Sequence, residues 1–293
     1  MKPIIPSIPK KVLVKEIASL NTEERYIERG EFQVYIVQTH RIPTIIQEIG
    51  RLREQTFRAV GEGTGNALDI DEFDKYYYNL FIWDKANEKI VGGYRVGTGD
   101  TIIKQYGIDG FYINSLFQIQ NTVLPILEQS LELGRSYIVQ EYQKGYLPLF
   151  LLWQGILYFL TKHPQYNYLI GPVSISKYYS QTSKSMIVNF VKQHYFNEEI
   201  AQYFQPRTPF VPQLGTAYDF EQIGTELRDL EKFMNTIEPA HIKLPVLLKQ
   251  YTKLNARFIS FNLDPNFSDA LDGLMLLDLK KLPAEIIRLL EEK

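Results

Sequence analysis

Arg53-Glu-Gln-Thr-Phe57-Arg58 is the first of three stretches that decide the fold. The other two are Asp69-Ile-Asp71-Glu72-Phe73-Asp74 and Val91-Gly-Gly-Tyr-Arg95. Arg53 and Phe57 stand four residues apart, so they share one face of a helix. A dense acidic run follows, and then a hairpin strand ends in a second arginine. These stretches predict a place where arginines from a helix and a strand meet the acidic run.

A fourth stretch, Leu131-Glu132-Leu133-Gly134-Arg135-Ser136, is typical of a buried strand that carries an acid and an arginine. Together the stretches resemble the N-acyltransferase branch of the GNAT superfamily. This branch holds the acyl-homoserine-lactone synthases and the enzymes that attach a fatty acyl chain to the amine of ornithine or glycine in aminolipids. The resemblance covers roughly residues 30 to 180, with weaker echoes at 206–209 and 244–251.

The resemblance implies a GNAT fold of the α/β (α+β) class, with a mixed twisted sheet, helices on both faces and a C-terminal helical elaboration. In such folds two neighbouring parallel strands splay apart. The gap admits a pantetheine arm, whose amides pair with the freed backbone. The expected pair is the strand ending near Arg95 and the strand containing Glu132. The order of predicted elements also suits a mixed sheet with helices on both faces.

Hydrophobic periodicity and turn residues predict the individual elements. Helices are expected at 12–20, 43–57, 121–129, 147–161, 184–194, 220–237, 244–254 and 284–292. Strands are expected at 31–39, 76–84, 89–95, 130–140, 168–175, 256–261 and 272–278, with a short extended segment at 111–117. The chain is expected to divide into a leader with a helix (1–29), a GNAT-like acyltransferase core (30–200) and a C-terminal extension packed on the core (201–293).

The composition excludes several classes of function. Hydrophobic residues make up 45% and charged residues 23% of the 293 residues, as in an ordinary globular protein. The net charge of −2 gives no overall field that would attract nucleic acid, so no nucleic-acid partner is expected. The absence of cysteine excludes disulfides and a cysteine nucleophile. The 4 histidines lack metal-ligand spacing, so no metal site is expected.

The N-terminal residues predict a cytoplasmic protein, because prolines interrupt them and they hold no continuous apolar region of a signal peptide. Two interpretations of the helix at 12–20 stay open. Its apolar and lysine residues could lie on a membrane surface, or the helix could simply dock on the core. The longest apolar stretch, residues 145–160, is too short for a membrane span and predicts a buried helix.

Acyl transfer to an amine needs a base that removes a proton from the ammonium before attack. Glu132 is the first candidate, acting through water, because its leucine neighbours would desolvate the carboxylate and raise its pKa. The alternative is a buried ion pair with Arg135 or Arg95 that only braces the sheet. Asp71 and Asp74 are the next candidates for the base.

The acidic run at 69–74 has two interpretations. Its carboxylates could bind the substrate ammonium and anchor Arg53 and Arg95, or they could start a helix, where negative charge is favourable. Arginines can fork onto a substrate carboxylate or phosphate. The resemblance places the signature of the family at Arg53, Phe57, Asp71, Asp74 and Arg95. The residues expected to bind substrate are Arg53, Phe57, Arg58, Arg95, Arg135 and Ser136.

The acyl donor is expected to be the acyl-phosphopantetheine arm of an acyl carrier protein, with no permanently bound cofactor. GNAT enzymes that use acetyl-coenzyme A carry the pattern Gln/Arg-x-x-Gly-x-Gly/Ala, whose amides cradle a pyrophosphate. Here Arg95-Val-Gly97-Thr-Gly99-Asp100 places the first glycine one position early and adds a negative charge. A carrier arm has one phosphate and no pyrophosphate, and it is also the donor that the resemblance implies.

The resemblance implies an N-acyltransferase that moves a long acyl chain, with or without a 3-hydroxyl group, to the α-amine of an amino acid in aminolipid synthesis. Glycine is favoured over ornithine and lysine. The acyl tail is expected along the aromatic surfaces of 147–161 and 110–117.

Two alternatives from other classes stay open. A synthase of acyl-homoserine lactones is disfavoured by the long C-terminal third and by the presence of only 2 tryptophans. A non-catalytic protein that binds lipid is disfavoured because Glu132, Arg95 and Arg135 are all retained.

Overall fold

The computed structural model describes residues 1–213, 223–237 and 243–286. The strands are β1 (Arg25–Arg29), β2 (Phe32–Gln38), β3 (Tyr78–Asp84), β4 (Lys89–Thr98), β5 (Phe117–Ile119), β6 (Ser130–Ile138), β7 (Tyr168–Ile175), β8 (Phe204–Pro206), β9 (Arg257–Asp264) and β10 (Ala270–Asp278). The helices are α1 (Lys10–Ala18), α2 (Ile45–Ala59), α3 (Gly99–Tyr106), α4 (Tyr112–Leu116), α5 (Leu124–Glu128), α6 (Leu147–Lys162), α7 (Gln181–His194), α8 (Glu198–Ala201), α9 (Leu227–Ile237) and α10 (Val246–Lys253).

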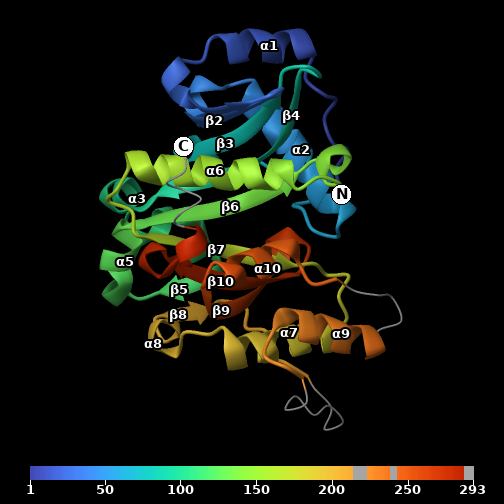
Figure 1. Cartoon of the computed structure of the whole chain (residues 1–293), viewed down its shortest axis with the longest axis vertical. Coiled ribbons are helices and arrows are strands. Elements are labelled where there is room, and N and C mark those ends of the chain that lie inside the picture. Colours follow the sequence, from blue (N-terminus) through green and yellow to red (C-terminus); the bar gives the residue numbers. More distant parts are fainter. Residues whose placement is uncertain (214–222, 238–242, 287–293) are drawn as a thin grey trace.

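Eight strands form one sheet in the order β1-β2-β3-β4-β6-β7-β10-β9, and β5 pairs with β8 in a separate ribbon (Figure 1). Neighbouring strands in the large sheet are antiparallel except β6 and β7, which are parallel. The C-terminal extension completes this sheet, because β10 pairs with β7 along its whole length and with β9 on its other side. The expected mixed sheet of a GNAT fold is confirmed.

Helices cover both faces of the sheet. In Figure 1, α6 crosses the front of the sheet, and residues of α7, α9 and α10 join the same hydrophobic cluster. The opposite face is covered by α1 and α2 over one half and by α3, α4 and α5 over the other. Leu151, Leu152 and Ile156 of α6 are buried against the sheet. Each such side chain contributes about 1.5–3 kcal/mol to stability relative to an exposed one.

Helix α1 docks on the core. Its Leu13 is buried in the cluster that includes α2, and Val14 and Ile17 pack against the same cluster. The apolar side that could have lain on a membrane is therefore occupied, which favours the docked-helix alternative. Within the three described ranges, no helix is both long and apolar enough to cross a bilayer.

Strands β6 and β7 pair only at their beginning and then separate. The pairs are Ser130 with Tyr168, Leu131 with Leu169 and Glu132 with Ile170. Beyond them β6 keeps its pairing with β4, while β7 keeps its pairing with β10. Two parallel strands that diverge in this way leave a row of β6 backbone groups without a partner strand in the described part of the chain.

The sequence-based prediction placed this split between β4 and β6, and that prediction is wrong. These two strands are antiparallel and stay paired from Thr98–Leu131 to Gly92–Ile138, apart from one irregularity. Arg95 pairs with Gly134 and Gly93 pairs with Tyr137, so β6 holds one extra residue there. Arg135 lies within this bulge with φ of 51°. A bulge bends its strand. Here the bulge lies where β6 is still paired with β4 but no longer paired with β7.

Most predicted elements are confirmed, with ends that differ by a few residues. They include every predicted strand, the helices at 12–20, 43–57, 147–161, 184–194 and 244–254, and the helix at 121–129, which forms as a 3-10 turn followed by α5. The helix predicted at 220–237 begins only at Leu227, and its first positions lie outside the described residues. Most of the helix predicted at 284–292 also lies outside them.

The extended segment predicted at 111–117 is wrong, because residues 112–116 form helix α4. The carboxylate of Glu132 accepts hydrogen bonds from the N–H groups of Tyr112 and Ile113, which open this helix. First-turn N–H groups have no partner inside a helix, so an acceptor from elsewhere stabilises the helical form. Strand β1 and helix α3 were also not predicted.

Gly171 of β7 marks the last close contact with β6, and we expect Gly171→Ala to destabilise the protein. A Cβ at this position would collide with the carbonyl oxygen of Leu133. We expect a loss of about 1–3 kcal/mol in the free energy of unfolding, measured by urea denaturation. Gly134→Ala is the matched control on β6, because no atom lies within 4 Å of its added Cβ. Equal losses for both variants would contradict the close contact.

Candidate active site

The split between β6 and β7 opens into a cavity of about 190 Å³. Strand β6 contributes Arg135 and Ser136, β7 contributes Pro172 and Ser174, and β10 contributes Asp272. The remaining lining residues are Phe57, Glu62, Tyr112, Pro245, Val246, Leu247 and Phe267. We call this cavity the cleft. Its lining residues come from both halves of the chain. They include Pro245, Val246 and Leu247, from the stretch 244–251 that weakly resembles the family.

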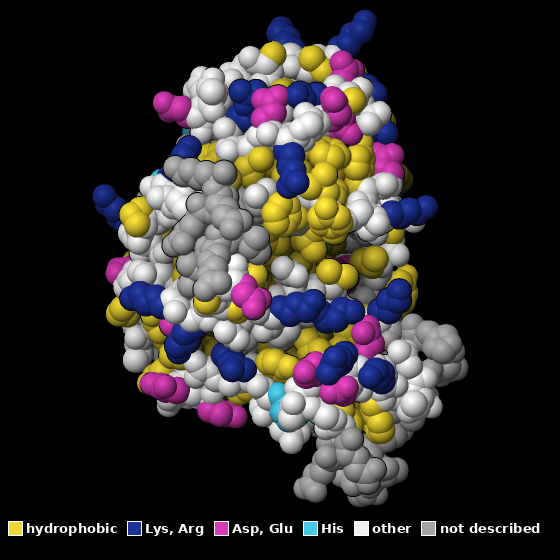
Figure 2. Space-filling view, in the orientation of Figure 1, with side chains coloured by type: hydrophobic (Ala, Val, Ile, Leu, Met, Phe, Trp, Pro, Cys, Tyr) yellow, Lys and Arg dark blue, Asp and Glu magenta, His cyan; other side chains and the backbone are white. Residues whose placement is uncertain are grey.

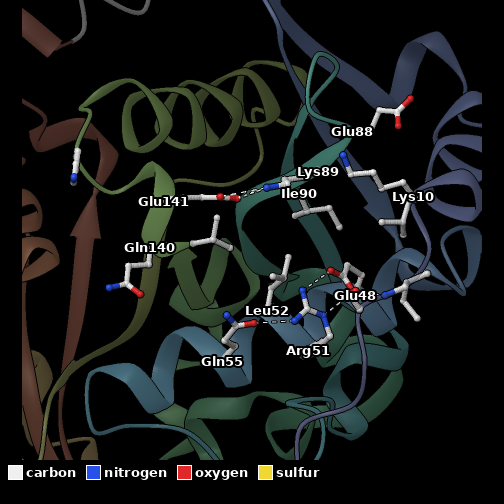
Figure 3. A pocket seen from close by; sticks show the side chains of 15 residues that line it. Lys10, Glu48, Arg51, Leu52, Gln55, Glu88, Lys89, Ile90, Gln140 and Glu141 are labelled. Carbon is white, nitrogen blue, oxygen red and sulfur yellow. Dashed lines mark hydrogen bonds and ion pairs between the residues drawn. The ribbon is translucent and has the colours of Figure 1, made fainter.

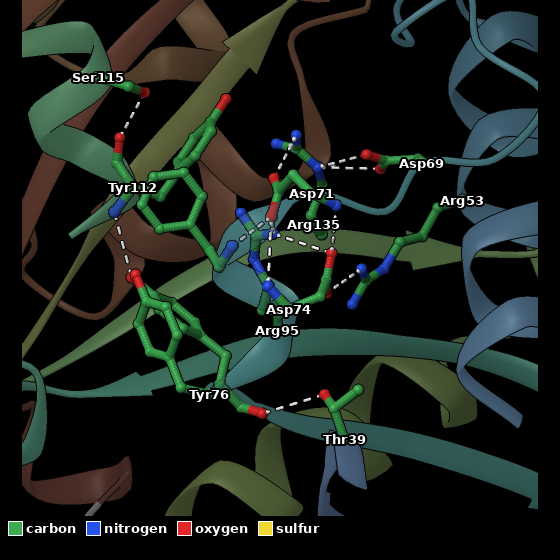
Figure 4. Close-up of polar contacts among 12 residues, drawn as sticks. Thr39, Arg53, Asp69, Asp71, Asp74, Tyr76, Arg95, Tyr112, Ser115 and Arg135 are labelled. Atoms are coloured by element: carbon green, nitrogen blue, oxygen red, sulfur yellow. Dashed lines mark hydrogen bonds and ion pairs between the residues drawn. The ribbon is translucent and has the colours of Figure 1, made fainter. Parts of the chain in front are cut away.

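Three arginines and three aspartates form a buried network behind the cleft (Figure 4). Arg53 of α2 donates from Nη1 to Asp74 Oδ1 at 2.8 Å. Arg95 of β4 donates to Asp71 and, at 3.2 Å, to Asp74 Oδ2. Arg135 Nε lies 2.9 Å from Asp69 Oδ2, and its Nη2 lies 3.4 Å from Asp71 Oδ2.

The acidic run starts a helix and anchors the arginines at the same time. Asp71 caps the 3-10 helix Glu72–Lys75 by accepting from the N–H of Phe73, and Asp74 accepts in return from the N–H of Asp71. Burial alone would raise the pKa of Asp74, but Arg53 and Arg95 lower it overall. The acidic run therefore starts a helical turn and also anchors Arg53 and Arg95, as the two interpretations stated. Binding of the substrate ammonium by this run stays a prediction.

Aromatic rings enclose two of the guanidinium groups. The Cζ of Arg95 lies 5.2–5.6 Å from the ring centres of Phe73, Tyr77 and Tyr112. The Cζ of Arg135 lies 4.7 Å from the ring centre of Tyr112 and 5.0 Å from that of Phe267. Such stacking stabilises a desolvated cation. Arg53 and Arg95 are both 1% exposed, and of the three arginines only Arg135 lines the cleft.

Glu132 lies in the part of β6 that is still paired with β7, before the two strands separate. The side chain is 1% exposed and is not among the residues that line the cleft. Its carboxylate accepts from the Tyr77 hydroxyl and, at 3.1 and 2.8 Å, from the N–H groups of Tyr112 and Ile113. Burial raises its pKa to about 7, although these hydrogen bonds and Arg95 lower it. This geometry favours a structural role, but the predicted ion pair with Arg95 or Arg135 is wrong, because both arginines pair with aspartates and Glu132 has no salt bridge among the described residues. The base role of Glu132 stays a prediction.

The other predicted residues divide between the cleft and the periphery. Phe57 lines the cleft and meets Phe267 edge to face, with ring centres 5.1 Å apart, and Ser136 lines it as well. Arg58 is not at the cleft. It donates to Glu54 at 2.7 Å and to the backbone oxygens of residues 2 and 66, so it ties the N-terminal segment to the loop after α2.

Two carboxylates of the cleft were missed in the sequence. Asp272 lies at the start of β10 and is 2% exposed, and Glu62 lies in the loop after α2. Burial raises the pKa of Asp272 to about 7 and that of Glu62 to about 8. An acid next to the apolar run of β10 was a signal in the sequence for Asp272. Glu62 carries no comparable signal.

The glycines of the turn after β4 pack inside the protein. A Cβ at Gly99 would collide with the carbonyl oxygen of Leu127, and one at Gly97 would meet the ring of Tyr77. This turn is not among the residues that line the cleft. The sequence argument against coenzyme A rested on this turn, and the choice of the acyl donor stays a prediction. The described residues also hold no group of three or more histidine, aspartate or glutamate side chains that could bind a metal.

A larger cavity, of about 630 Å³, lies between α1, α2 and the ends of β4 and β6 (Figure 3). Its charged side chains largely pair with one another. Arg51 donates to Glu48 at 2.6 Å, and Lys89 lies 3.1 Å from Glu141. None of the predicted site residues lines this cavity. The cleft at the strand split, although smaller, is therefore the candidate active site.

Comparison with known proteins relates this chain to acyltransferases. Residues 52–154 match the acetyltransferase (GNAT) domain family. The glycine N(alpha)-acyltransferase of Bacteroides thetaiotaomicron is 30% identical over 285 residues, covering 88% of this chain and 83% of its own. The protein of the same name from Phocaeicola vulgatus is 32% identical over 282 residues, covering 88% and 86%. The chain belongs to this N-acyltransferase family.

Family membership makes this N-acyltransferase an enzyme, so the alternative of a non-catalytic lipid-binding protein loses its basis. Among solved structures, the CoA-dependent acyl-homoserine lactone synthase BjaI is similar at 10% identity with a TM-score of 0.43, covering 87% of this chain and 84% of its own. The synthase LasI gives 15% identity and a TM-score of 0.36, covering 55% and 79%. Both likenesses are remote.

We expect Arg53→Met to reduce the free energy of unfolding by about 3–5 kcal/mol, because it leaves a buried aspartate short of a partner. The lost contacts are those with Asp74 and, at 3.0 Å, with Asn79. Lys89→Met is the control, since its pair with Glu141 is exposed and contributes at most about 1 kcal/mol. Urea denaturation measures both. A loss for Arg53→Met no larger than that of the control would show that the network is not needed for stability.

The variant Glu132→Gln distinguishes a catalytic base at this position from a residue that only stabilises the fold. The glutamine NH₂ cannot accept a hydrogen bond, so at least one of the three donors loses its acceptor, at a cost of about 1–3 kcal/mol. We expect a lower melting temperature and a kcat that changes little in the folded fraction, measured by circular dichroism and an acylation assay. A loss of kcat of roughly 10²-fold with an unchanged melting temperature would instead support Glu132 as the base.

Proposed function

We propose that this N-acyltransferase moves a long fatty acyl chain, with or without a 3-hydroxyl group, from acyl carrier protein to the α-amine of glycine. The product is an N-acylglycine, a lyso-aminolipid. The observation that carries the proposal is the similarity to two proteins named glycine N(alpha)-acyltransferase, each over 88% of this chain.

The size of the cleft supports a small acceptor. Its volume of about 190 Å³ lies below the ~300–1,000 Å³ typical of pockets that bury drug-sized ligands. Glycine has no side chain to accommodate, whereas ornithine and lysine carry a long chain with a second ammonium group. Arg135 lines the cleft as the guanidinium that a substrate carboxylate would meet.

The separated strands support a thioester donor with an amide-containing arm. From Leu133 onward β6 has no pairing with β7 in the described residues, so its backbone groups are available to the amides of a pantetheine arm. The thioester carbonyl would then lie near Arg135 and Ser136. Because a carrier arm and coenzyme A share the pantetheine portion, the choice of acyl carrier protein rests on the family resemblance.

The proposed reaction follows from this placement. The amine nitrogen of glycine attacks the thioester carbon, the C–S bond breaks, and the thiolate leaves as a thiol. Two protons leave the ammonium overall, one to a base and one to the thiolate. The reaction needs no covalent enzyme intermediate, in keeping with a chain that has no cysteine.

The acyl tail has one candidate surface outside the cleft. Figure 2 shows hydrophobic side chains gathered on the face that α6 crosses, and Tyr146, Phe150 and Tyr158 are the exposed large ones at this helix. The segment 110–117, the other expected surface, is largely buried and offers little area. We therefore assign the tail to the α6 side, in a cytoplasmic reaction.

The purified protein tests the proposal in a matrix of donors and acceptors. Acyl carrier protein and coenzyme A carry the same long acyl chain, and glycine, ornithine, lysine and S-adenosylmethionine are offered in turn. We expect N-acylglycine from the carrier protein, detected by mass spectrometry, and at least tenfold lower kcat/KM for the other acceptors, about 1.4 kcal/mol. Equal use of ornithine overturns the choice of glycine, equal use of coenzyme A overturns the choice of donor, and an acyl-homoserine lactone product overturns both.

A further inference from the structure

We propose that Asp272 and Glu62 form the amine subsite of the cleft, with Asp272 as the base that takes the proton from the substrate ammonium and Glu62 as the carboxyl group that accepts a hydrogen bond from this ammonium. The inference rests on the proposed acylation of an amino acid within the cleft. It assigns the proton transfer to β10, in the C-terminal extension, and away from the acidic run at 69–74.

The position of Asp272 in the sheet supports this role. Asp272 pairs in register with Ser174 of β7, two positions beyond Pro172 on the strand that has left β6. Both Asp272 and Ser174 line the same cavity as Arg135 and Ser136 on β6. A thioester lying along β6 would therefore have the Asp272 carboxylate across the cleft, on the side from which an amine can approach.

The hydrogen bonding of Asp272 leaves one oxygen for a ligand. Oδ1 accepts from the Ser174 hydroxyl at 2.6 Å, which orients the carboxylate. Oδ2 has no hydrogen-bond partner among the described residues, although the side chain is almost fully buried and lines the cavity. Oδ2 is not among the fully buried unpaired side-chain atoms of the described residues, so it is open to a substrate N–H in the cleft.

The charges around the subsite favour a cation. Asp272 and Glu62 have no ion-pair partner in the described part of the chain, and Asp264 is buried nearby, accepting at 3.1 Å from the Tyr112 hydroxyl. Arg135 is the cation that faces them, and Asp69 and Asp71 already neutralise it. A substrate ammonium would favour the ionised form of these two carboxyl groups, because an opposite charge close by lowers the pKa of a carboxyl group.

The acidities suit the proton transfer. Burial raises the pKa of Asp272 to about 7, with Asp264 raising it further and the Ser174 hydrogen bond and Arg135 lowering it. A base works best when its pKa lies near the working pH. Burial, and then the charge of Asp272, raises the pKa of Glu62 to about 8. In the reaction, Asp272 takes one ammonium proton, the neutral amine attacks, and the second proton leaves with the thiolate.

The test compares Asp272→Asn, Glu62→Gln and Asp84→Asn in steady-state kinetics with glycine. Asp84 is the matched control, since it is equally buried, accepts from a hydroxyl, that of Tyr142 at 2.7 Å, and does not line the cleft. We expect kcat to fall by roughly 10²-fold in Asp272→Asn and KM for glycine to rise about tenfold in Glu62→Gln. We expect the control to keep both constants. An unchanged kcat in Asp272→Asn, or an unchanged KM in Glu62→Gln, overturns the corresponding role.

A pH profile of kcat/KM keeps the inference testable if Asp272→Asn fails to fold. The wild-type profile should rise as pH increases through about 7, because only the ionised Asp272 accepts a proton. Ser174→Ala removes a hydrogen bond that lowers the pKa of Asp272, so the rise should move to higher pH. A purely structural role of Ser174 would lower activity at every pH without moving the rise, and that outcome overturns the assignment.

The experiments distinguish a wrong choice of substrate from a wrong assignment of the base. If the wild-type enzyme does not acylate glycine but acylates another amine, the proposed substrate is wrong, and the same variants are measured with that amine. If the wild type acylates glycine and Asp272→Asn does so equally well, only the assignment of the base is wrong. Binding of the acyl donor, measured by calorimetry, should be the same in Asp272→Asn and the wild type. A loss of donor binding would show that Asp272 serves the donor and not the amine.

Discussion

The backbone of Arg135 has φ of 51°, a left-handed conformation that costs a residue with a Cβ about 1–3 kcal/mol. It inserts one extra residue into β6 opposite β4, so that β6 bends while its pairing with β4 continues. The ion pairs of the same side chain with Asp69 and Asp71, and its contacts with two aromatic rings, offset this cost. The bulge beside the strand split and the guanidinium at the cleft therefore involve the same residue.

The charged groups of this region fall into two sets with opposite properties. Behind the cleft, Arg53, Arg95 and Arg135 are matched by Asp69, Asp71 and Asp74, so a dense array of buried charges is neutral overall. Such an array stabilises one arrangement of α2, β4 and β6, because removing any member leaves an uncompensated charge. In the cleft, Asp272 and Glu62 have no ion-pair partner within the described ranges, and burial raises the pKa of both. The carboxyl groups that can exchange a proton therefore lie where a substrate can reach them.

The stretches between residues 53 and 136 predicted the class of fold and the contact of the acidic run with Arg53 and Arg95, but not its contact with Arg135. Arg53 and Phe57 do share one side of α2, and the acidic run does meet Arg53 and Arg95. These contacts were predictable because opposite charges in the three stretches can be matched by residue type, although the partners lie 21 and 24 positions apart. The failures came from contacts of which the residue pattern gives no sign. Glu132 turns residues 112–116 into a helix from a strand that starts fourteen positions later, and periodicity carries no signal of that.

The sequence by itself determined most of the strands and helices, the family and the contact of the acidic run with Arg53 and Arg95. Local pattern specifies these features, because side-chain periods and opposite charges can be recognised without knowing which strands are neighbours. Only the tertiary structure decided where the sheet splits and which carboxylates face the gap. The split depends on β6 being parallel to β7 and antiparallel to β4, and Asp272 reaches it only because β10 pairs with β7. Strand neighbours are set by packing across the whole sheet, so a short stretch of sequence does not encode them.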